Sequence, residues 1–280
     1  MSRYKGRPKG VVLYEGKSEI NGEDIVLIAT FQTSNDKTGN LIQTWILPKD
    51  TNPIEAINTG KDEAVCGSCP LRGIIMNAKD SKYKGSGMHD TINRFRGCYV
   101  AVQNAPRAVW TAYKVGKYPQ YDPEVHARWI KGRGFRMGSY GEPVAVPLDV
   151  WTPVIALANQ KSIPGYTHQW NNPKFSNTDW KYHVMASTHT VEETELAQSM
   201  GWRTYRVRKP DQPLLPSEAE CPASEAGGFQ HTCESCGACD GARRGNDKQK
   251  SSMSIIAHGG QSKLTAALKV IDSVPLKEVA

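Results

Sequence analysis

The sequence predicts an α/β protein whose core is a partial or irregular (β/α) barrel. Three features support this fold class: β-branched N-terminal segments separated by turns, strand–helix alternation from Gly134 onward, and a cysteine-rich metal loop near the C-terminus. Strands that alternate with helices favour βαβ units and a parallel sheet. An open doubly wound sheet is the runner-up. We expect a β meander over 1–52, an α/β barrel-like core over 53–260 and a C-terminal helix over 261–280.

The first fifty residues predict a three-stranded antiparallel meander. Residues 11–14, 24–31 and 41–47 are rich in β-branched and aromatic side chains. The stretches between them, 21–22 and 35–40, contain Asn and Gly, which tolerate the positive φ angles of turns. Short loops of this kind connect neighbouring antiparallel strands.

Helices and strands follow in alternation after the meander. Pro106 and Pro123 each suit the first turn of a helix, where the N–H that proline lacks is not needed. Thr190 and Glu193 form a capping-box signature for a helix that ends before Gly201. The other predicted elements are strands at 135–139, 164–168, 182–187, 202–208 and 254–259, and helices at 147–159 and 262–271.

Composition predicts a cytoplasmic protein and permits a polyanionic partner. The 280 residues carry a net charge of +7, and no stretch approaches the roughly 20 apolar residues of a membrane span. No apolar signal segment follows the basic N-terminus. Basic residues gather in 2–9 and 243–250, which allows phosphate contact, although a solvated surface is the default interpretation.

The C-terminal cysteines predict a closed metal site. Cys233, Cys236 and Cys239 form a CxxCxxC run, and Cys221 lies upstream before a proline. Three thiols at this short spacing favour a 4Fe–4S cluster over zinc, since a zinc knuckle usually needs one CxxC pair. A reducing compartment also disfavours disulfides between these residues. Zinc remains the alternative occupant.

Cys66, Cys69 and Cys98 predict a second metal site that is open. Three thiolates on a 4Fe–4S cluster leave one iron without a protein ligand, as catalytic metal sites keep a free position. His89 offers another solution, a Cys3His zinc site. Cys98 would otherwise be an ordinary buried thiol, or the two cysteine groups would share one centre.

Polar residues at the predicted strand ends indicate a ligand pocket, because ligands of α/β sheets bind beyond the carboxyl ends of strands. Arginines there suit a carboxylate or phosphate, and histidines can move protons near neutral pH. A strand-end Ser or His also often caps a helix. The candidates are Arg136, Ser139, Glu142, His168, Ser187, His189, Arg206, Arg208 and His258.

Several motifs together resemble a family of bacteriophage-encoded cysteine-rich proteins of uncharacterised function. They are Asp36-Lys37-Thr38-Gly39, Cys66-Gly67-Ser68-Cys69-Pro70, Gly97-Cys98-Tyr99-Val100, the segment 136–143 and the terminal cysteine run. The resemblance spans about residues 30–260. It implies an iron–sulfur cluster, a barrel-like α/β core and the host cytoplasm. The family often has a longer cysteine run in its first group than this chain has.

These observations lead to one main functional hypothesis and two alternatives. The main one is an iron–sulfur protein that carries out redox or Lewis-acid chemistry on a small anionic or nucleotide-like ligand. The first alternative is a nucleic-acid-binding accessory protein with a structural zinc or iron–sulfur site and no catalysis. The second is a zinc-stapled module that binds a host protein. No Walker loop, GxSxG elbow or HExxH helix indicates other chemistry.

Overall fold

The computed structural model describes residues 6–77, 91–245 and 249–273. Its strands are β1 (Gly10–Lys17), β2 (Asp24–Thr30), β3 (Ile42–Pro48), β4 (Ile74–Asn77), β5 (Thr91–Arg94), β6 (Phe135–Tyr140), β7 (Tyr166–Thr167), β8 (Met185–Thr188), β9 (Thr204–Arg208), β10 (Glu218–Glu220) and β11 (Ser252–Ile256). Its α-helices are α1 (Pro53–Thr59), α2 (Glu63–Cys66), α3 (Ala105–Lys114), α4 (Pro123–Ile130), α5 (Leu148–Leu157), α6 (Pro173–Ser176), α7 (Val191–Ser199), α8 (Cys233–Cys236) and α9 (Gln261–Ser273).

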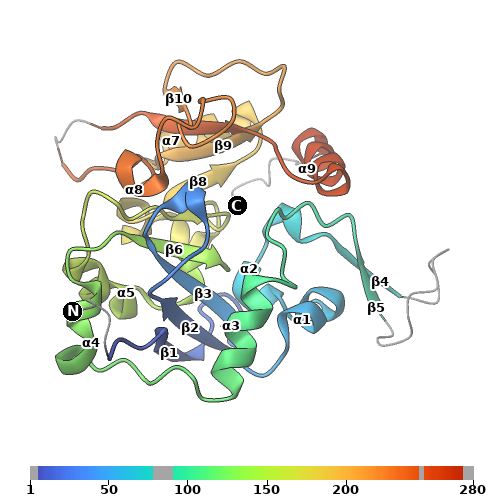
Figure 1. Cartoon of the computed structure of the whole chain (residues 1–280). Helices are drawn as coiled ribbons and strands as arrows, with labels where there is room; N and C mark the ends of the chain where they lie inside the picture. The colour runs from blue at the N-terminus through green and yellow to red at the C-terminus, as the bar shows by residue number, and fades with distance from the viewer. Residues whose placement is uncertain (1–5, 78–90, 246–248, 274–280) are drawn as a thin grey trace.

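Two sheets form the centre of the molecule (Figure 1). The first has the order β1-β2-β3-β6, with β1, β2 and β3 antiparallel and β6 parallel to β3. The second has the order β10-β11-β9-β8-β7 and is parallel throughout. The predicted N-terminal meander and the mixed α/β class are confirmed.

The two sheets meet edge to edge beside β6. A parallel bridge pairs Met137 with Gly165, and the Met137 N–H donates to the Pro164 carbonyl oxygen at 2.9 Å. One buried apolar cluster contains side chains from both sheets, among them Phe135 and Ala186. The described residues do not close the strands into a ring, because β1 and β10 are the outer strands of their sheets and do not pair with each other, so a barrel is not confirmed.

The sequence placed some elements incorrectly. The strand predicted at 182–187 begins only at Met185, because the His183 and Val184 N–H groups donate to the Trp180 carbonyl oxygen and continue a 3-10 turn. The last strand lies at Ser252–Ile256, two residues before its predicted start. Neither the β4–β5 hairpin nor β10 was predicted, since these strands are only four and three residues long. In the described parts of the chain, no helix has the length and apolar character of a membrane span.

A buried ion pair joins two strands of the parallel sheet. Arg206 on β9 donates to the Glu218 carboxylate on β10 at 2.6 and 2.8 Å, and both side chains are almost fully buried. The same guanidinium donates to the Pro213 carbonyl oxygen. Removing one member of such a pair leaves a buried charge without its partner, which is strongly destabilising.

We therefore predict that Arg206→Met lowers the free energy of unfolding by about 3–5 kcal/mol, measured by chemical denaturation. Lys17→Met is the matched control, because Lys17 pairs with Asp24 where both side chains are more than half exposed. The control should lose less than about 1 kcal/mol. Equal losses in the two variants would contradict the structural role given to Arg206.

Candidate metal centre and ligand cavity

A cavity of about 360 Å³ lies between the two sheets, and all seven cysteines contribute to its wall. On two strands of the parallel sheet, the residues that line it alternate along the chain, as the two-residue period of a strand requires. β9 contributes Tyr205 and Val207, and β11 contributes Met253 and Ile255. The cavity therefore lies on one face of the parallel sheet, and the cysteine segments cover that face.

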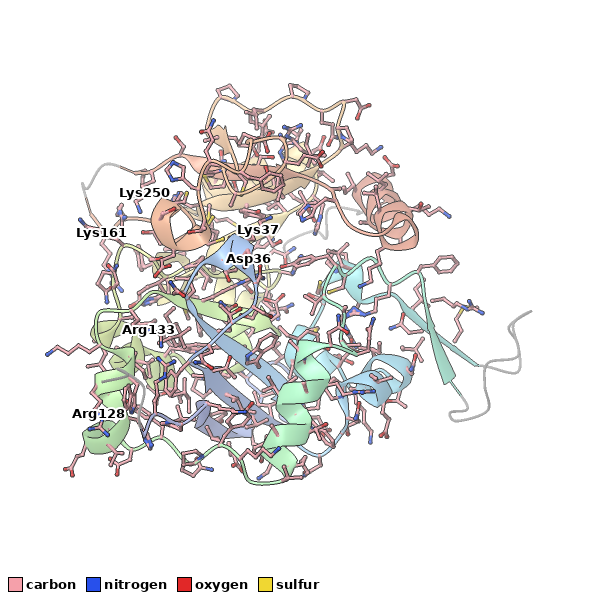
Figure 2. The ribbon with its side chains drawn as sticks, in the orientation of Figure 1. Asp36, Lys37, Arg128, Arg133, Lys161 and Lys250 are labelled. Atoms are coloured by element: carbon pink, nitrogen blue, oxygen red, sulfur yellow. The ribbon has the colours of Figure 1, made fainter. Side chains whose placement is uncertain are left out.

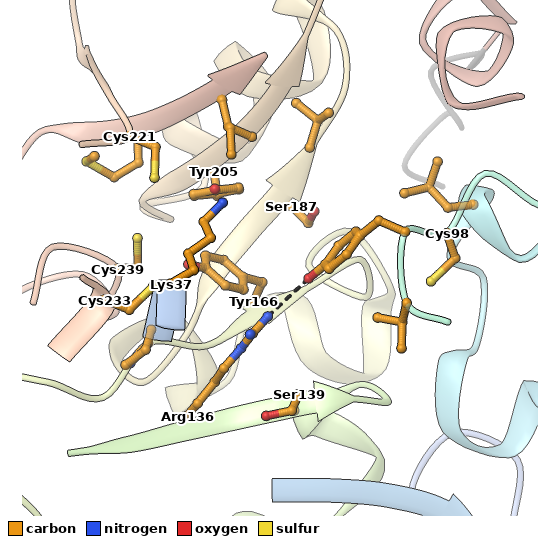
Figure 3. Close-up of a pocket in the computed structure, with 18 of the residues that line it drawn as sticks. Lys37, Cys98, Arg136, Ser139, Tyr166, Ser187, Tyr205, Cys221, Cys233 and Cys239 are labelled. Atoms are coloured by element: carbon orange, nitrogen blue, oxygen red, sulfur yellow. Dashed lines mark hydrogen bonds between the residues drawn. The ribbon is translucent and has the colours of Figure 1, made fainter. Parts of the chain in front are cut away.

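Four thiols gather at one end of the cavity, where Figure 3 shows Cys221, Cys233 and Cys239 close together. Cys221 directly follows β10, and its N–H donates to the Ser254 carbonyl oxygen on β11. Cys233 and Cys236 begin and end the short helix α8, which Thr232 caps through the Ser235 N–H. All seven cysteines of the chain are free thiols.

A buried arginine fixes the loop that follows α8. The Arg203 guanidinium donates to the Asp240 carboxylate at 2.7 Å and to the carbonyl oxygens of Ala238 and Ser251. Lys250, beside α8 in Figure 2, donates to the Gly237 carbonyl oxygen at 3.0 Å and to the Asp240 carboxylate at 2.9 Å. These bonds fix the backbone on both sides of Cys239.

Two tyrosine phenols lie beside this thiol group, Tyr166 next to Cys239 and Tyr205 next to Cys221. Burial raises the pKa of both phenols well above the ordinary value, so each keeps its O–H. Burial also raises the pKa of Cys239 to about 12, although the Tyr166 hydroxyl opposes this shift. Hydrogen bonds to ligand sulfurs are one of the means by which proteins tune iron–sulfur clusters.

Two cations face the same end of the cavity without a carboxylate partner. Arg136 lies on β6, and Lys37 lies on a 3-10 turn, Asp36–Thr38 (Figure 3). Within the described part of the chain, neither forms an ion pair. The Arg136 guanidinium donates to the Tyr99 hydroxyl at 3.0 Å. Burial disfavours its charge, but Tyr99, Tyr166 and Cys233 raise its pKa, so it remains a cation.

The other end of the cavity holds Cys66, Cys69 and Cys98. The turn between Cys66 and Cys69 is fixed by Arg72, which donates to the Gly67 carbonyl oxygen at 2.7 Å and to the buried Asp62 carboxylate at 2.7 Å. Burial raises the pKa of Cys66 and of Cys98. His89, the alternative fourth ligand here, lies outside the described residues.

Cys69 is close to a histidine that a carboxylate holds in place. Its Sγ lies 3.8 Å from His168 Nε2, and His168 Nδ1 lies 2.9 Å from Glu142 Oε1. His189 Nε2 lies 3.2 Å from His168 Nε2, and the two rings are stacked. Burial opposes charge on His168, but Cys69 and Glu142 raise its pKa well above the ordinary value. Burial and the neighbouring His168 lower the pKa of His189 to about 3.

The structure brings most, but not all, of the predicted pocket residues to the cavity. Arg206 and Arg208 point to the other face of the sheet, where they pair with Glu218 and Glu220. His189 contacts His168 behind the cavity wall, and its Nδ1 has no hydrogen-bond partner among the described residues. The six that line the cavity are Arg136, Ser139, Glu142, His168, Ser187 and His258.

Sequence reasoning missed Lys37, Tyr166, Tyr205 and Arg203. On β9 it selected Arg206 and Arg208, the polar face of the strand, whereas Tyr205 on the opposite face lines the cavity. Alternation within a strand identifies two faces but does not say which one faces a ligand. Tyr166, two residues before His168, had a usable signal, because residues i and i+2 of a strand share a face.

The backbone at Gly237, in the cysteine loop, packs closely against the backbone at Lys161. The φ of Gly237 is +59°, and a Cβ atom there would lie 1.9 Å from the Lys161 carbonyl oxygen. Gly245 has a similar φ of +62°, but no atom of the described residues lies within 4 Å of such a Cβ. The two positions share the backbone strain and differ only in the clash.

We predict that Gly237→Ala lowers the free energy of unfolding by at least about 2 kcal/mol, because it adds a clash to the left-handed strain. Gly245→Ala should cost about 1–2 kcal/mol, the strain alone. Denaturant unfolding of both variants measures the difference. Equal costs would mean that the loop does not approach Lys161 as closely as the structure indicates.

Comparisons with protein-family models, with curated proteins and with solved structures give no match to this chain. The chemistry of the site therefore has to be inferred from its own residues.

Proposed function

We propose that the chain is an iron–sulfur protein whose cluster is bound by Cys221, Cys233, Cys236 and Cys239. The observation that carries the proposal is the grouping of these four thiols at one end of a cavity that also contains two unpaired cations. The cavity would hold a small anionic or nucleotide-like ligand next to the cluster. A 4Fe–4S cluster, when bound, supplies one-electron redox chemistry or a Lewis-acidic iron.

The spacing of the thiols fits a cluster better than a single zinc ion. Among the described residues, only Cys69, Glu142 and His168 bring three His, Cys, Asp or Glu ligand atoms within 4.8 Å of one another. Neighbouring sulfurs around one tetrahedral zinc ion are about 3.8 Å apart, given zinc–sulfur bonds of about 2.3 Å. No three of the four C-terminal sulfurs lie within 4.8 Å of one another, which supports the larger cofactor.

The charge of the surroundings also suits this cofactor. Four thiolates around an oxidised cubane core leave a net negative charge, which is costly to bury without compensation. Arg136 and Lys37 would oppose that charge, and the charge of an anionic ligand as well. Arg136 presents a planar set of donors suited to a carboxylate or phosphate. Tyr99, which accepts a hydrogen bond from Arg136, would hold the guanidinium in position.

We extend the proposal to the barrel-like fold and to the cellular compartment. The two sheets, joined beside β6, would form an incomplete barrel with the cavity on its concave face. Free thiols suit a reducing cytoplasm, that of a bacterial host if the chain is phage-encoded. Nucleic-acid binding gains no support from the described residues, because Arg243 and Lys250 pair with Asp240, and Arg244 pairs with Asp179.

We predict that protein purified without oxygen is brown and binds about four iron and four sulfide per chain, as a 4Fe–4S cluster requires. Cys236→Ala should lose most of this iron, because it removes one of the four ligands. Cys66→Ala is the matched control and should retain it. Iron and acid-labile sulfide assays report the difference, and colourless protein with stoichiometric zinc would contradict the proposal.

A further inference from the structure

The second cysteine group contains a thiol, an imidazole and a carboxylate in series. Cys69 Sγ is 3.8 Å from His168 Nε2, and the opposite ring nitrogen, Nδ1, is 2.9 Å from Glu142 Oε1. Cys69 and His168 both line the cavity, so a bound ligand can reach the thiol. A nucleophile, a base and a group that orients the base form the usual arrangement of nucleophilic catalysis.

Hydrogen bonds fix the orientation of the histidine ring. The Glu142 carboxylate accepts from the His168 backbone N–H at 3.0 and 3.1 Å. Because a carboxylate accepts hydrogen bonds, we assign the proton of the 2.9 Å contact to His168 Nδ1. The Glu142 backbone N–H in turn donates to the Val65 carbonyl oxygen, next to Cys66. With Nδ1 bound in this way, Nε2 is the atom that faces Cys69 and can exchange a proton with it.

We propose that Cys69 is a nucleophile, that His168 is its base and that Glu142 is the positioning residue for His168. Its substrate class is a small ester or amide of an anionic acid, whose charged group contacts Arg136. This inference goes beyond the cluster proposal and does not depend on it. It assigns Cys69 to covalent chemistry rather than to metal binding.

The proposed step balances without a further oxidant or reductant. The Cys69 proton first passes to His168 Nε2, which gives a thiolate beside an imidazolium, and the thiolate sulfur then forms a bond to the acyl carbon. His168 then gives this proton to the departing alcohol or amine, and the bond from that group to the acyl carbon breaks. Water, with His168 again as base, hydrolyses the resulting thioester and restores the thiol.

Two alkylating agents test the nucleophile directly, iodoacetamide, which is neutral, and iodoacetate, which is an anion. Each forms a sulfur–carbon bond and releases iodide while the thiol proton goes to the base. The experiment uses the full chain loaded with iron and sulfide, under reducing conditions, with mass spectrometry to identify the modified cysteine. Cys69 should be modified first, before Cys66 and Cys98.

Variants of His168 and Glu142 distinguish a role in proton transfer from a purely structural role. His168→Gln should slow alkylation of Cys69 roughly 100-fold, as loss of a general base does. Glu142→Gln should slow it at least roughly tenfold, and Glu142→Asp, which keeps a carboxylate, should retain more of the rate. In Cys66→Ser and Cys98→Ser, the alkylation rate of Cys69 should stay within about twofold of its rate in the native protein. Unfolding midpoints of all variants verify that they fold.

The choice of reagent tests the anion site. Arg136→Met should lower the ratio of the iodoacetate rate to the iodoacetamide rate roughly fivefold, because it removes a positive charge from the wall of the cavity that Cys69 also lines. Lys161→Met is the matched control, since Lys161 is exposed and does not line the cavity. An unchanged ratio in Arg136→Met would show that Arg136 does not bind the anionic group of the substrate.

The nucleophile assignment would be overturned by modification of Cys66 or Cys98 before Cys69, or by an unchanged Cys69 rate in folded His168→Gln. Protection of Cys69 by bound iron or zinc would also overturn it, because the thiol would then be a metal ligand. Iron content of Cys69→Ser reports on the C-terminal cluster separately, so failure of either proposal can be distinguished from failure of the other.

Discussion

A few buried arginines hold in place segments that have little regular structure of their own. Arg203 contacts Ala238, Asp240 and Ser251 at once and fixes the loop that contains Cys239. Arg72 does the same for the turn between Cys66 and Cys69. A guanidinium with five donors can satisfy several buried carbonyl oxygens that would otherwise lose their contact with water. Both thiol groups therefore have fixed positions before any ligand binds.

The cavity connects two different kinds of chemistry. One end contains four thiols with tyrosine hydroxyls and cations beside them, which is an environment for a negatively charged cofactor. The other end contains a thiol in series with His168 and Glu142, which suits proton transfer and covalent attack. Arg136 extends from β6 into the space between them. A ligand bound by Arg136 would lie in the one cavity that both cysteine groups line.

Sequence patterns predicted the elements better than the site. The meander, the helices whose first turns contain Pro106 and Pro123, and the helix capped by Thr190 follow from local signals, and the structure contains them all. The union of Cys69 with His168 and Glu142 could not be predicted, because it joins three segments far apart in the chain. The pairing of Arg206 with Glu218 likewise depends on β11 lying between β9 and β10, which local signals do not encode.

The most direct test compares the iron and acid-labile sulfide of anaerobically purified protein with those of Arg203→Met, which keeps all seven cysteines. We expect about four of each per chain in the native protein and a large loss in Arg203→Met, because the loop no longer presents Cys239 correctly. Full iron content in Arg203→Met, or zinc in place of iron in the native protein, would contradict this expectation.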